Sequence, residues 1–276
     1  MWYQNRYELD QISSAGRYHY FADNGNPIVR MNASFWLECE KDDTAFTQPA
    51  INTGNWEAWV ATAIMRELHE QGNETEFVDI GANNGYYSMM VSSAGYGVTA
   101  FEPNPTLVEM LERSAKLNNI SQSYENPKSF GVNQVALSDV DPYDKNGKPN
   151  LAQLYTHSNH SGASSLEGEG EGFTVRLSNL DFEIMPLETT VLKVDVEGHE
   201  RNVWNGSSDL RQNEDTIWFV EWVPVRWGKE YNREWLTEVL QTHNLQMVNY
   251  DGTLRPVGIE EALQVEFETI VFRKRN

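Results

Sequence analysis

From residue 77 onward, short apolar runs of strand length alternate with segments whose apolar residues have helical spacing. The apolar runs predict strands at 77–80, 98–101, 132–137, 190–196, 217–223, 245–250 and 267–272. The helical spacing predicts helices at 86–94, 106–117 and 233–242. Because parallel strands need long crossover connections, usually helical, this order predicts an α/β fold with a mostly parallel sheet and helices on both faces.

Residues 1–55 do not follow this alternation. They contain short apolar runs separated by turn residues, such as the Asp-Asn-Gly-Asn-Pro break at 23–27. Directly after residues 1–55, apolar residues spaced four apart between 56 and 68 predict a helix, with Thr53 or Asn55 as its N-cap. We therefore expect a β-rich N-terminal extension, 1–55, and a main α/β domain, 56–276.

The stretch 141–172 interrupts the alternation. It carries Gly162 and an alternating Glu-Gly run at 167–172, and it has no apolar period. A structureless loop of this length inside a compact domain is usually functional or mobile. Two interpretations stay open, namely a lid over a functional site and a solvated excursion.

The turn after the first predicted strand is a candidate ligand site, because open α/β sheets bind ligands beyond the carboxyl ends of their strands. Gly81 and Gly85 allow a ligand to approach the backbone closely, and Asn83 tolerates unusual φ values. Glu102 ends the next strand, where a carboxylate accepts hydrogen bonds from two ribose hydroxyls. A tight turn with a purely structural role is the simpler alternative.

The same turn argues against a dinucleotide. Asn83 stands where dinucleotide enzymes have the glycine that lets the backbone approach a pyrophosphate. A nucleoside without phosphates does not need that glycine, and Asp79 is placed to meet an ammonium group. S-adenosylmethionine has a ribose for Glu102 and an amino acid end for the turn, so it is the predicted cofactor.

Three segments together resemble the FkbM family of S-adenosylmethionine-dependent methyltransferases. They read Val-Asp-Ile-Gly-Ala-Asn-Asn-Gly-Tyr-Tyr-Ser at 78–88, Ala-Phe-Glu-Pro-Asn-Pro at 100–105 and Leu-Lys-Val-Asp-Val-Glu-Gly-His-Glu at 192–200. The segments 135–139 and 162–166 are similar to further family segments, and the similarity spans roughly 56–223. The segment 192–200 is the most discriminating, since generic methyltransferases of this fold lack it.

The resemblance implies a Rossmann-like, seven-stranded class I methyltransferase fold whose last two strands form a hairpin, here around Asp251 and Gly252. It also implies a cofactor site. The first 50 residues match no family pattern, and we expect the extension 1–55 to help define the methyl acceptor. The implied cofactor-binding residues are Asp79, Gly81, Ala82, Asn83 and Gly85 near the methionine portion, Glu102 with Pro103 at the ribose, Ser138 and Asp139 near the adenine, and Asp195 close to the methyl group.

The segment 192–200 carries the candidate catalytic residues. Lys193, Asp195 and Glu197 alternate, so in an extended strand they share one face. Asp195 or Glu197 is then the positioner or general base of a hydroxyl acceptor, or Lys193 merely holds a carboxylate in place. His199 is the other base candidate because its ordinary pKa is near neutrality, although it also stands where it can cap the next helix.

Glu221 closes the next strand on the same rim, which makes it a fifth catalytic candidate. With Asp195 and Glu197 it forms a set that suits magnesium or the recognition of an acceptor hydroxyl. We favour the hydroxyl and predict no metal, because nothing in the sequence singles one out. His157 and His160 lack further zinc ligands, and His160 is placed to reach the acceptor from a closing lid.

The charge balance restricts the partners. The chain has 41 acidic and 21 basic residues and a net charge of −20, which disfavours nucleic acid and membrane surfaces. Cys39 is the single cysteine, and there is neither a membrane-length apolar run nor an N-terminal signal stretch, so we expect a cytoplasmic protein. The sequence leaves the oligomeric state open.

The predicted function is O-methylation of a hydroxyl on a sugar, glycan or secondary metabolite, with a small-molecule or glycan acceptor. Three alternatives stay open. They are an RNA 2′-O-methyltransferase, a nicotinamide oxidoreductase, and a module that binds S-adenosylmethionine without catalysis.

Overall fold

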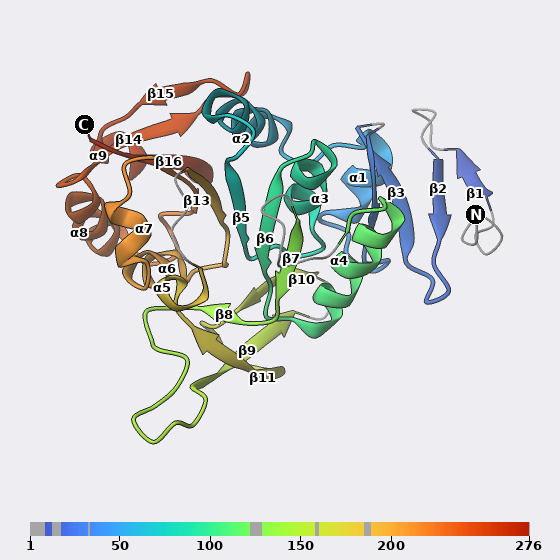
Figure 1. Ribbon diagram of the computed structural model, residues 1–276, viewed down its shortest axis with the longest axis horizontal. Coiled ribbons are helices and arrows are strands. Elements are labelled where there is room, and N and C mark those ends of the chain that lie inside the picture. Colours follow the sequence, from blue (N-terminus) through green and yellow to red (C-terminus); the bar gives the residue numbers. More distant parts are fainter. Residues whose placement is uncertain are drawn as a thin grey trace.

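The computed structural model describes residues 9–12, 18–32, 34–121, 129–157, 160–184 and 189–275. Within these residues the main sheet has eight strands, in the order β15-β14-β16-β13-β12-β5-β6-β7 (Figure 1). They are β5 (Glu76–Ile80), β6 (Gly97–Phe101), β7 (Phe130–Asn133), β12 (Thr190–Val194), β13 (Thr216–Trp222), β14 (His243–Val248), β15 (Leu254–Pro256) and β16 (Glu268–Lys274).

The pairing directions confirm the predicted Rossmann-like class I methyltransferase fold. Strands β7, β6, β5, β12 and β13 pair in parallel, whereas β16 runs antiparallel to both β13 and β14. The predicted terminal hairpin is different in detail. The turn at Asp251 and Gly252 leads from β14 into the extra strand β15, and β16 returns only after helix α9 (Ile259–Ala262).

Helices cover both faces of the sheet, as predicted. One face packs against α2 (Ala58–Gln71), α3 (Tyr86–Ser93) and α4 (Pro105–Leu117), and the other against α5 (Leu180–Glu183), α6 (Glu200–Asn205), α7 (Ser208–Gln212), α8 (Lys229–Val239) and α9. In β12, Val191 belongs to the first core, while Leu192 and Val194 belong to the second. The alternation therefore places Lys193 on the face covered by α2 and α3.

The start of α2 was predicted wrongly. Thr53 is the last residue of α1 (Thr47–Thr53), a helix that the sequence pattern did not reveal, and Gly54 ends it with φ +64°. The residue before α2 is Glu57, which has φ +37° and makes no side-chain cap hydrogen bond. Because a left-handed glutamate is uncommon, tertiary contacts rather than capping preference must set this helix start.

The N-terminal part is β-rich, as predicted. Strands β1 (Leu9–Ile12), β2 (Tyr18–Phe21), β3 (Pro27–Met31) and β4 (Phe35–Glu38) form an antiparallel sheet on the side of α3 and α4 (Figure 1). The buried apolar residues of β3 and β4 share one core with α2, α3 and α4. Glu38, which is 1% exposed, also accepts from Arg113 of α4, with Nε at 2.7 Å and Nη2 at 3.0 Å.

The stretch 141–172 was predicted to have no regular structure, as a lid or a solvated excursion, but it contains β9 (Leu151–His157) and β10 (His160–Ser165). With β8 (Ala136–Leu137) and β11 (Gly172–Ser178) these strands form a small sheet of order β10-β9-β11-β8. The predicted strand 132–137 is accordingly split, since β8 pairs with β11 rather than with the main sheet. Among the residues of this sheet whose burial is described, Ala136, Leu154 and Val175 form a small core of its own, which explains the missing apolar period.

Candidate active site

A cleft opens at the carboxyl ends of β5, β6 and β12, where the sequence predicted a ligand. Its empty volume is about 540 Å³, including space that opens to solvent. The predicted site residues that line it are Gly81, Asn83, Glu102, Pro103, Asp195, Glu197 and His199. Apolar side chains form much of the remaining wall, namely Ile80 and Phe101 at the ends of β5 and β6, Val135, Leu137 of β8, Val196, and Leu107 of α4.

Internal packing dictates the glycines of the β5–α3 turn. Gly81 has φ +77°, and a Cβ there would lie 1.8 Å from the carbonyl oxygen of Asp195. Gly85 has φ +89°, and a Cβ there would lie 2.7 Å from Cγ of Leu111. Asn83 between them has φ +54°, as its residue type suggested. The turn is therefore held against the end of β12, and it presents Gly81 and Asn83 to the cleft.

Glu102 fastens the turn to the next strand. The N–H of Asn83 donates to its Oε2 at 2.8 Å, and the N–H of Asn104 donates to its Oε1 at 2.8 Å. Glu102 is 5% exposed, and burial raises its pKa to about 7, although the two N–H groups act in the opposite direction. Each carboxylate oxygen has a second lone pair, so Glu102 can still accept from hydroxyls in the cleft.

Asp79 lies behind the turn rather than on the cleft surface. It is 1% exposed and accepts a hydrogen bond from Oγ of Ser88 at 2.6 Å. Burial raises its pKa to about 6, while Ser88 and the ammonium of Lys193 lower it. Ala82 and Gly85 likewise belong to the turn without lining the cleft. Asp79 thus supports the turn from inside the sheet.

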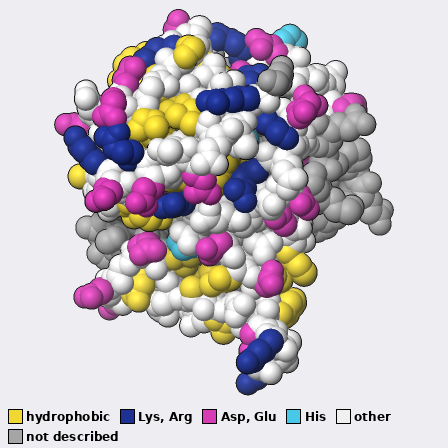
Figure 2. Space-filling view, turned by 90° about the vertical axis from the view of Figure 1, so that its left-hand side faces the viewer, with side chains coloured by type: hydrophobic (Ala, Val, Ile, Leu, Met, Phe, Trp, Pro, Cys, Tyr) yellow, Lys and Arg dark blue, Asp and Glu magenta, His cyan; other side chains and the backbone are white. Residues whose placement is uncertain are grey.

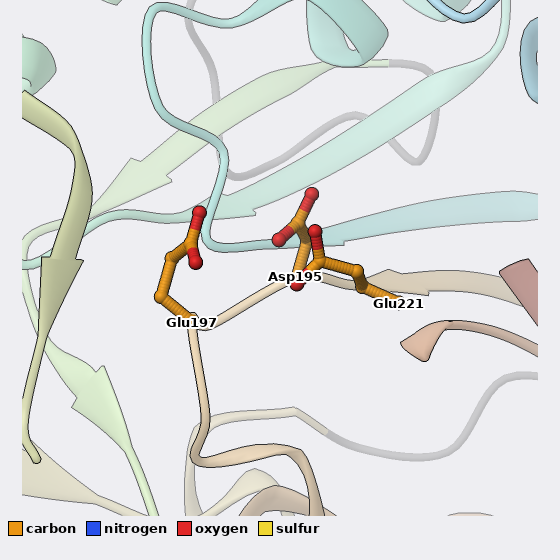
Figure 3. Close-up of side chains that lie close together, drawn as sticks. All are labelled: Asp195, Glu197 and Glu221. Atoms are coloured by element: carbon orange, nitrogen blue, oxygen red, sulfur yellow. The ribbon is translucent and has the colours of Figure 1, made fainter. Parts of the chain in front are cut away.

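The three predicted carboxylates meet beside the cleft. Oxygen atoms of Asp195, Glu197 and Glu221 all lie within 4.8 Å of one another (Figure 3). Lys193 donates from Nζ to Oδ2 of Asp195 at 3.0 Å. Arg226 donates from Nη1 to Glu221 at 2.7 Å and from Nη2 to Glu197. The spacing suits a hard cation, but Lys193 and Arg226 already place positive charge against all three acids.

Crowding of charges dominates the electrostatics of this cluster. Burial raises the pKa of Glu221 well above its ordinary value, and repulsion from Asp195 and Glu197 adds to the effect. Burial lowers the pKa of Lys193, but attraction from Asp195, Glu57 and Glu221 outweighs it and leaves the pKa raised. Lys193 therefore stays an ammonium although it is 1% exposed.

Sequence reasoning missed three members of this network. Arg226 lies in the connection after β13, where no sequence pattern distinguishes it from a surface arginine. Glu57 directly precedes α2. Tyr87 donates from its hydroxyl to Oε2 of Glu57 at 2.5 Å, and Nζ of Lys193 lies 5.5 Å from the centre of the Tyr87 ring. Only the position of Tyr87 next to the glycine turn gave a signal. The charged network thus runs from Asp195 through Lys193 to the start of α2.

His199 joins the cleft to β8. Its Nε2 lies 2.9 Å from Oγ of Ser138, which also donates to Asp139 at 3.1 Å. Its Nδ1 lies 3.7 Å from Oε1 of Glu167, and burial lowers the pKa of the imidazole. His199 is the N-cap residue of α6, where the sequence placed it, but its side chain makes no cap hydrogen bond. The side chains of His157 and His160 lie outside the described residues.

The comparison with protein families decides the classification. Residues 79–244 match the model of the methyltransferase FkbM domain. The chain belongs to the FkbM methyltransferase family. The matched region starts in β5 and ends in β14, so it contains the glycine turn, Glu102 and the whole carboxylate cluster. The resemblance found in the sequence is confirmed, and the chain is a methyltransferase.

Solved structures similar to this FkbM chain are distant. An FkbM methyltransferase from Methylobacillus flagellatus KT is 11% identical with a TM-score of 0.42, covering 72% of this chain and 43% of that one. A Pyrococcus abyssi tRNA (uracil-54, C5)-methyltransferase in complex with S-adenosylhomocysteine is 11% identical (TM-score 0.42, coverage 90% and 44%). A Bacillus cereus O-methyltransferase is 8% identical (TM-score 0.39, coverage 86% and 84%). The chain thus spans less than half the length of the first two, and no curated protein sequence matches it.

Proposed function

We propose that this FkbM methyltransferase uses S-adenosylmethionine to methylate a hydroxyl of a sugar, glycan or secondary metabolite. The observation that carries the proposal is the position of Glu102 at the cleft, locked by two backbone N–H groups and next to a cluster of carboxylates. One cleft thereby offers an acceptor for ribose hydroxyls and carboxylates able to take a proton.

The residues of the cleft fit the cofactor. Glu102 would accept from the ribose hydroxyls, and the turn with Gly81 and Asn83, supported by Asp79, would meet the amino acid portion. The apolar wall with Phe101 and Leu137 suits an adenine. Ser138 and Asp139, the predicted adenine contacts, follow Leu137 directly but do not line the cleft. When bound, the cofactor supplies a methyl group on a positively charged sulfur.

Asp195 is the residue best placed to take the acceptor's proton. Transfer forms an oxygen–carbon bond and breaks a carbon–sulfur bond, and the hydroxyl proton leaves to a base. Asp195 lines the cleft with 30% of its side chain exposed, and its Oδ2 accepts from Lys193. Oδ1 is then the oxygen that takes the proton, while Glu197 and Glu221, held by Arg226, bind neighbouring hydroxyls of the acceptor.

The test is a transfer screen with the full chain, S-adenosylmethionine and a panel of sugars and polyols, read out as S-adenosylhomocysteine formed. We expect turnover on some hydroxyl compound and a loss of about 100-fold or more in kcat for Asp195→Asn. S-adenosylhomocysteine affinity should stay within about threefold, since Asn keeps the size of the side chain. Binding without turnover on any acceptor would instead favour the non-catalytic module.

The carboxylate cluster makes metal removal informative. Because Lys193 and Arg226 already pair with all three acids, we expect the rate to be unchanged by excess EDTA. A rate that EDTA abolishes and magnesium restores would instead assign the cluster to a cation.

A further inference from the structure

The small sheet contributes more to the cleft than Leu137 of β8, the one residue of it that the proposed function uses. Leu154 of β9, Ser164 of β10 and Leu166 directly after β10 line the cleft together with the glycine turn and Glu102. Figure 1 shows this sheet set apart from the main sheet, below α5 and α6. The residues involved include the segment 162–166, which the sequence singled out without a role.

Ser165 fixes the small sheet to the segment that follows β12. It is 9% exposed, and its Oγ donates to the carbonyl oxygen of Glu197 at 2.8 Å. The same oxygen accepts from the N–H of Glu167 at 3.1 Å. The buried hydroxyl therefore both donates and accepts, and its bond to Glu197 joins the end of β10 to the turn that follows β12.

The segment that Ser165 holds is conformationally demanding. Glu197 has φ +53° and Gly198 has φ +114°. A non-glycine residue in the left-handed region costs free energy, and it persists only where its surroundings hold it. A Cβ on Gly198 would lie 3.4 Å from Cζ2 of Trp227, so the space beside the turn is also filled.

Glu200 holds the same segment through backbone N–H groups, whereas Ser165 binds a backbone carbonyl oxygen. Its Oε1 accepts from the N–H of Val196 at 3.2 Å and from the N–H of Gly198 at 3.1 Å. Glu200 comes from α6 in the main domain, whereas Ser165 comes from the small sheet. The turn that follows Asp195 is thus fixed from two sides, and one of the two belongs to the small sheet.

We infer that Ser165 is a positioning residue for the cofactor cleft, and that the small sheet is one wall of that cleft. The inference rests on the proposed function, because it takes the cleft to bind the adenosine part of the cofactor. Ser165 keeps the turn at 196–198 in place beside Asp195, and Leu154 and Leu166 add apolar surface. Removing the Ser165 hydroxyl therefore weakens cofactor binding without removing any atom that lines the cleft.

The test is calorimetric titration of the full chain with S-adenosylhomocysteine and with 5′-methylthioadenosine, which lacks the amino acid portion. We expect Ser165→Ala to weaken both ligands by about tenfold, because one buried hydrogen bond to a strained turn is lost. Ser165→Thr keeps the hydroxyl and should bind within about threefold of the natural chain. Thr174→Ala is the matched control, since it removes an exposed hydroxyl from β11 of the same sheet.

Circular dichroism at the titration temperature separates positioning from folding. A purely structural Ser165 would lower the melting temperature of Ser165→Ala and leave the affinity of the folded protein unchanged, which would overturn the inference. If Ser165→Ala does not fold, Leu166→Ala replaces it in the same titrations. It should weaken both ligands several-fold, and unchanged affinity would again overturn the inference. If the natural chain binds neither ligand, the proposed function itself fails.

Discussion

Glu102 combines two properties that rarely occur together in one carboxyl group. It accepts two backbone N–H bonds, and yet its pKa is raised to about 7, because burial outweighs the hydrogen bonds. Hydrogen bonds from ribose hydroxyls would favour the ionised form, so cofactor binding must lower this pKa. The affinity of the cleft should therefore depend on pH near neutrality.

We predict that S-adenosylhomocysteine binds more tightly as the pH rises from 6 to 8. With a pKa of about 7 in the free protein, the ionised fraction and hence the affinity should rise about tenfold over this range. Calorimetry at several pH values measures the effect. Glu102→Gln should bind weakly with little pH dependence, whereas an unchanged profile in that variant would assign the titration to another group.

Asp79 gives a prediction about stability. Its pKa is raised to about 6 from an ordinary value near 3.8, so the folded protein holds the proton more strongly than the unfolded chain. The contribution of Asp79 to the free energy of unfolding is therefore largest below pH 4. This contribution falls by about 3 kcal/mol in total as the pH rises through 6. Asp79→Asn removes that loss.

The measurement is urea unfolding of the natural chain and Asp79→Asn between pH 4 and pH 7.5. The free energy of unfolding of the variant relative to the natural chain should increase by about 2–2.5 kcal/mol across this range, since part of the total loss already occurs below pH 4. Glu169→Gln, at an exposed position, is the control and should show no such trend. If the difference in unfolding free energy between Asp79→Asn and the natural chain does not change with pH, burial does not raise the pKa of Asp79.

At the residue scale, the sequence revealed the acids that end strands. Asp79, Glu102 and Asp195 each lie at or just beyond the end of an apolar run, so their shared edge followed from the fold class alone. Arg226 and Glu57 were missed because they lie in connections whose paths depend on tertiary packing. No local pattern distinguishes these two from surface charges.

At the scale of elements, the main-sheet strands and their helices were predictable because each has a strong apolar pattern. The small sheet was not, because β10 and β11 contain mostly polar residues or glycine, and β11 pairs with β9 and β8 from far along the chain. Their stability comes from a small core and from contacts with the cleft. Such contacts are not encoded in any local period.

One ion pair adds to the hydrogen bonds and apolar contacts that pack β4 on α4. Arg113 makes two hydrogen bonds to the buried Glu38, while its own side chain is 37% exposed. Arg113→Met should lower the free energy of unfolding by about 1–2 kcal/mol, less than for a fully buried pair because solvent screens the arginine. Lys116→Met, at an exposed position of α4, is the control in urea unfolding. Equal free energies of unfolding for the two variants would mean that this ion pair does not stabilise the fold.

At the scale of the whole molecule, the charge of −20 divides into two populations. Some acids are committed to the site, where Lys193 and Arg226 pair with them. Others pair across the surface, as in Arg255 with Glu261 at 2.6 Å and Arg201 with Glu238 at 3.6 Å. Figure 2 shows acidic and basic side chains interspersed on the face that carries the C-terminal strands. Every described helix is too short or too polar to cross a bilayer.

This distribution predicts weak interaction with nucleic acid. Binding to a phosphate backbone needs basic residues that release counterions, and here the basic side chains are interleaved with acids. A labelled single-stranded RNA should show no change in fluorescence anisotropy at low salt up to about 100 μM protein, the weak end of non-specific binding. Affinity that falls steeply with salt would revive the RNA 2′-O-methyltransferase alternative.

The most direct test of the central claim is a calorimetric titration with S-adenosylhomocysteine at pH 8, for the natural chain and for Glu102→Ala. We expect one binding site per chain, and an affinity at least about tenfold lower for Glu102→Ala, because the ribose loses its charged acceptor. The absence of binding to the natural chain, or equal affinity of the two proteins, would contradict the assignment of this cleft to the cofactor.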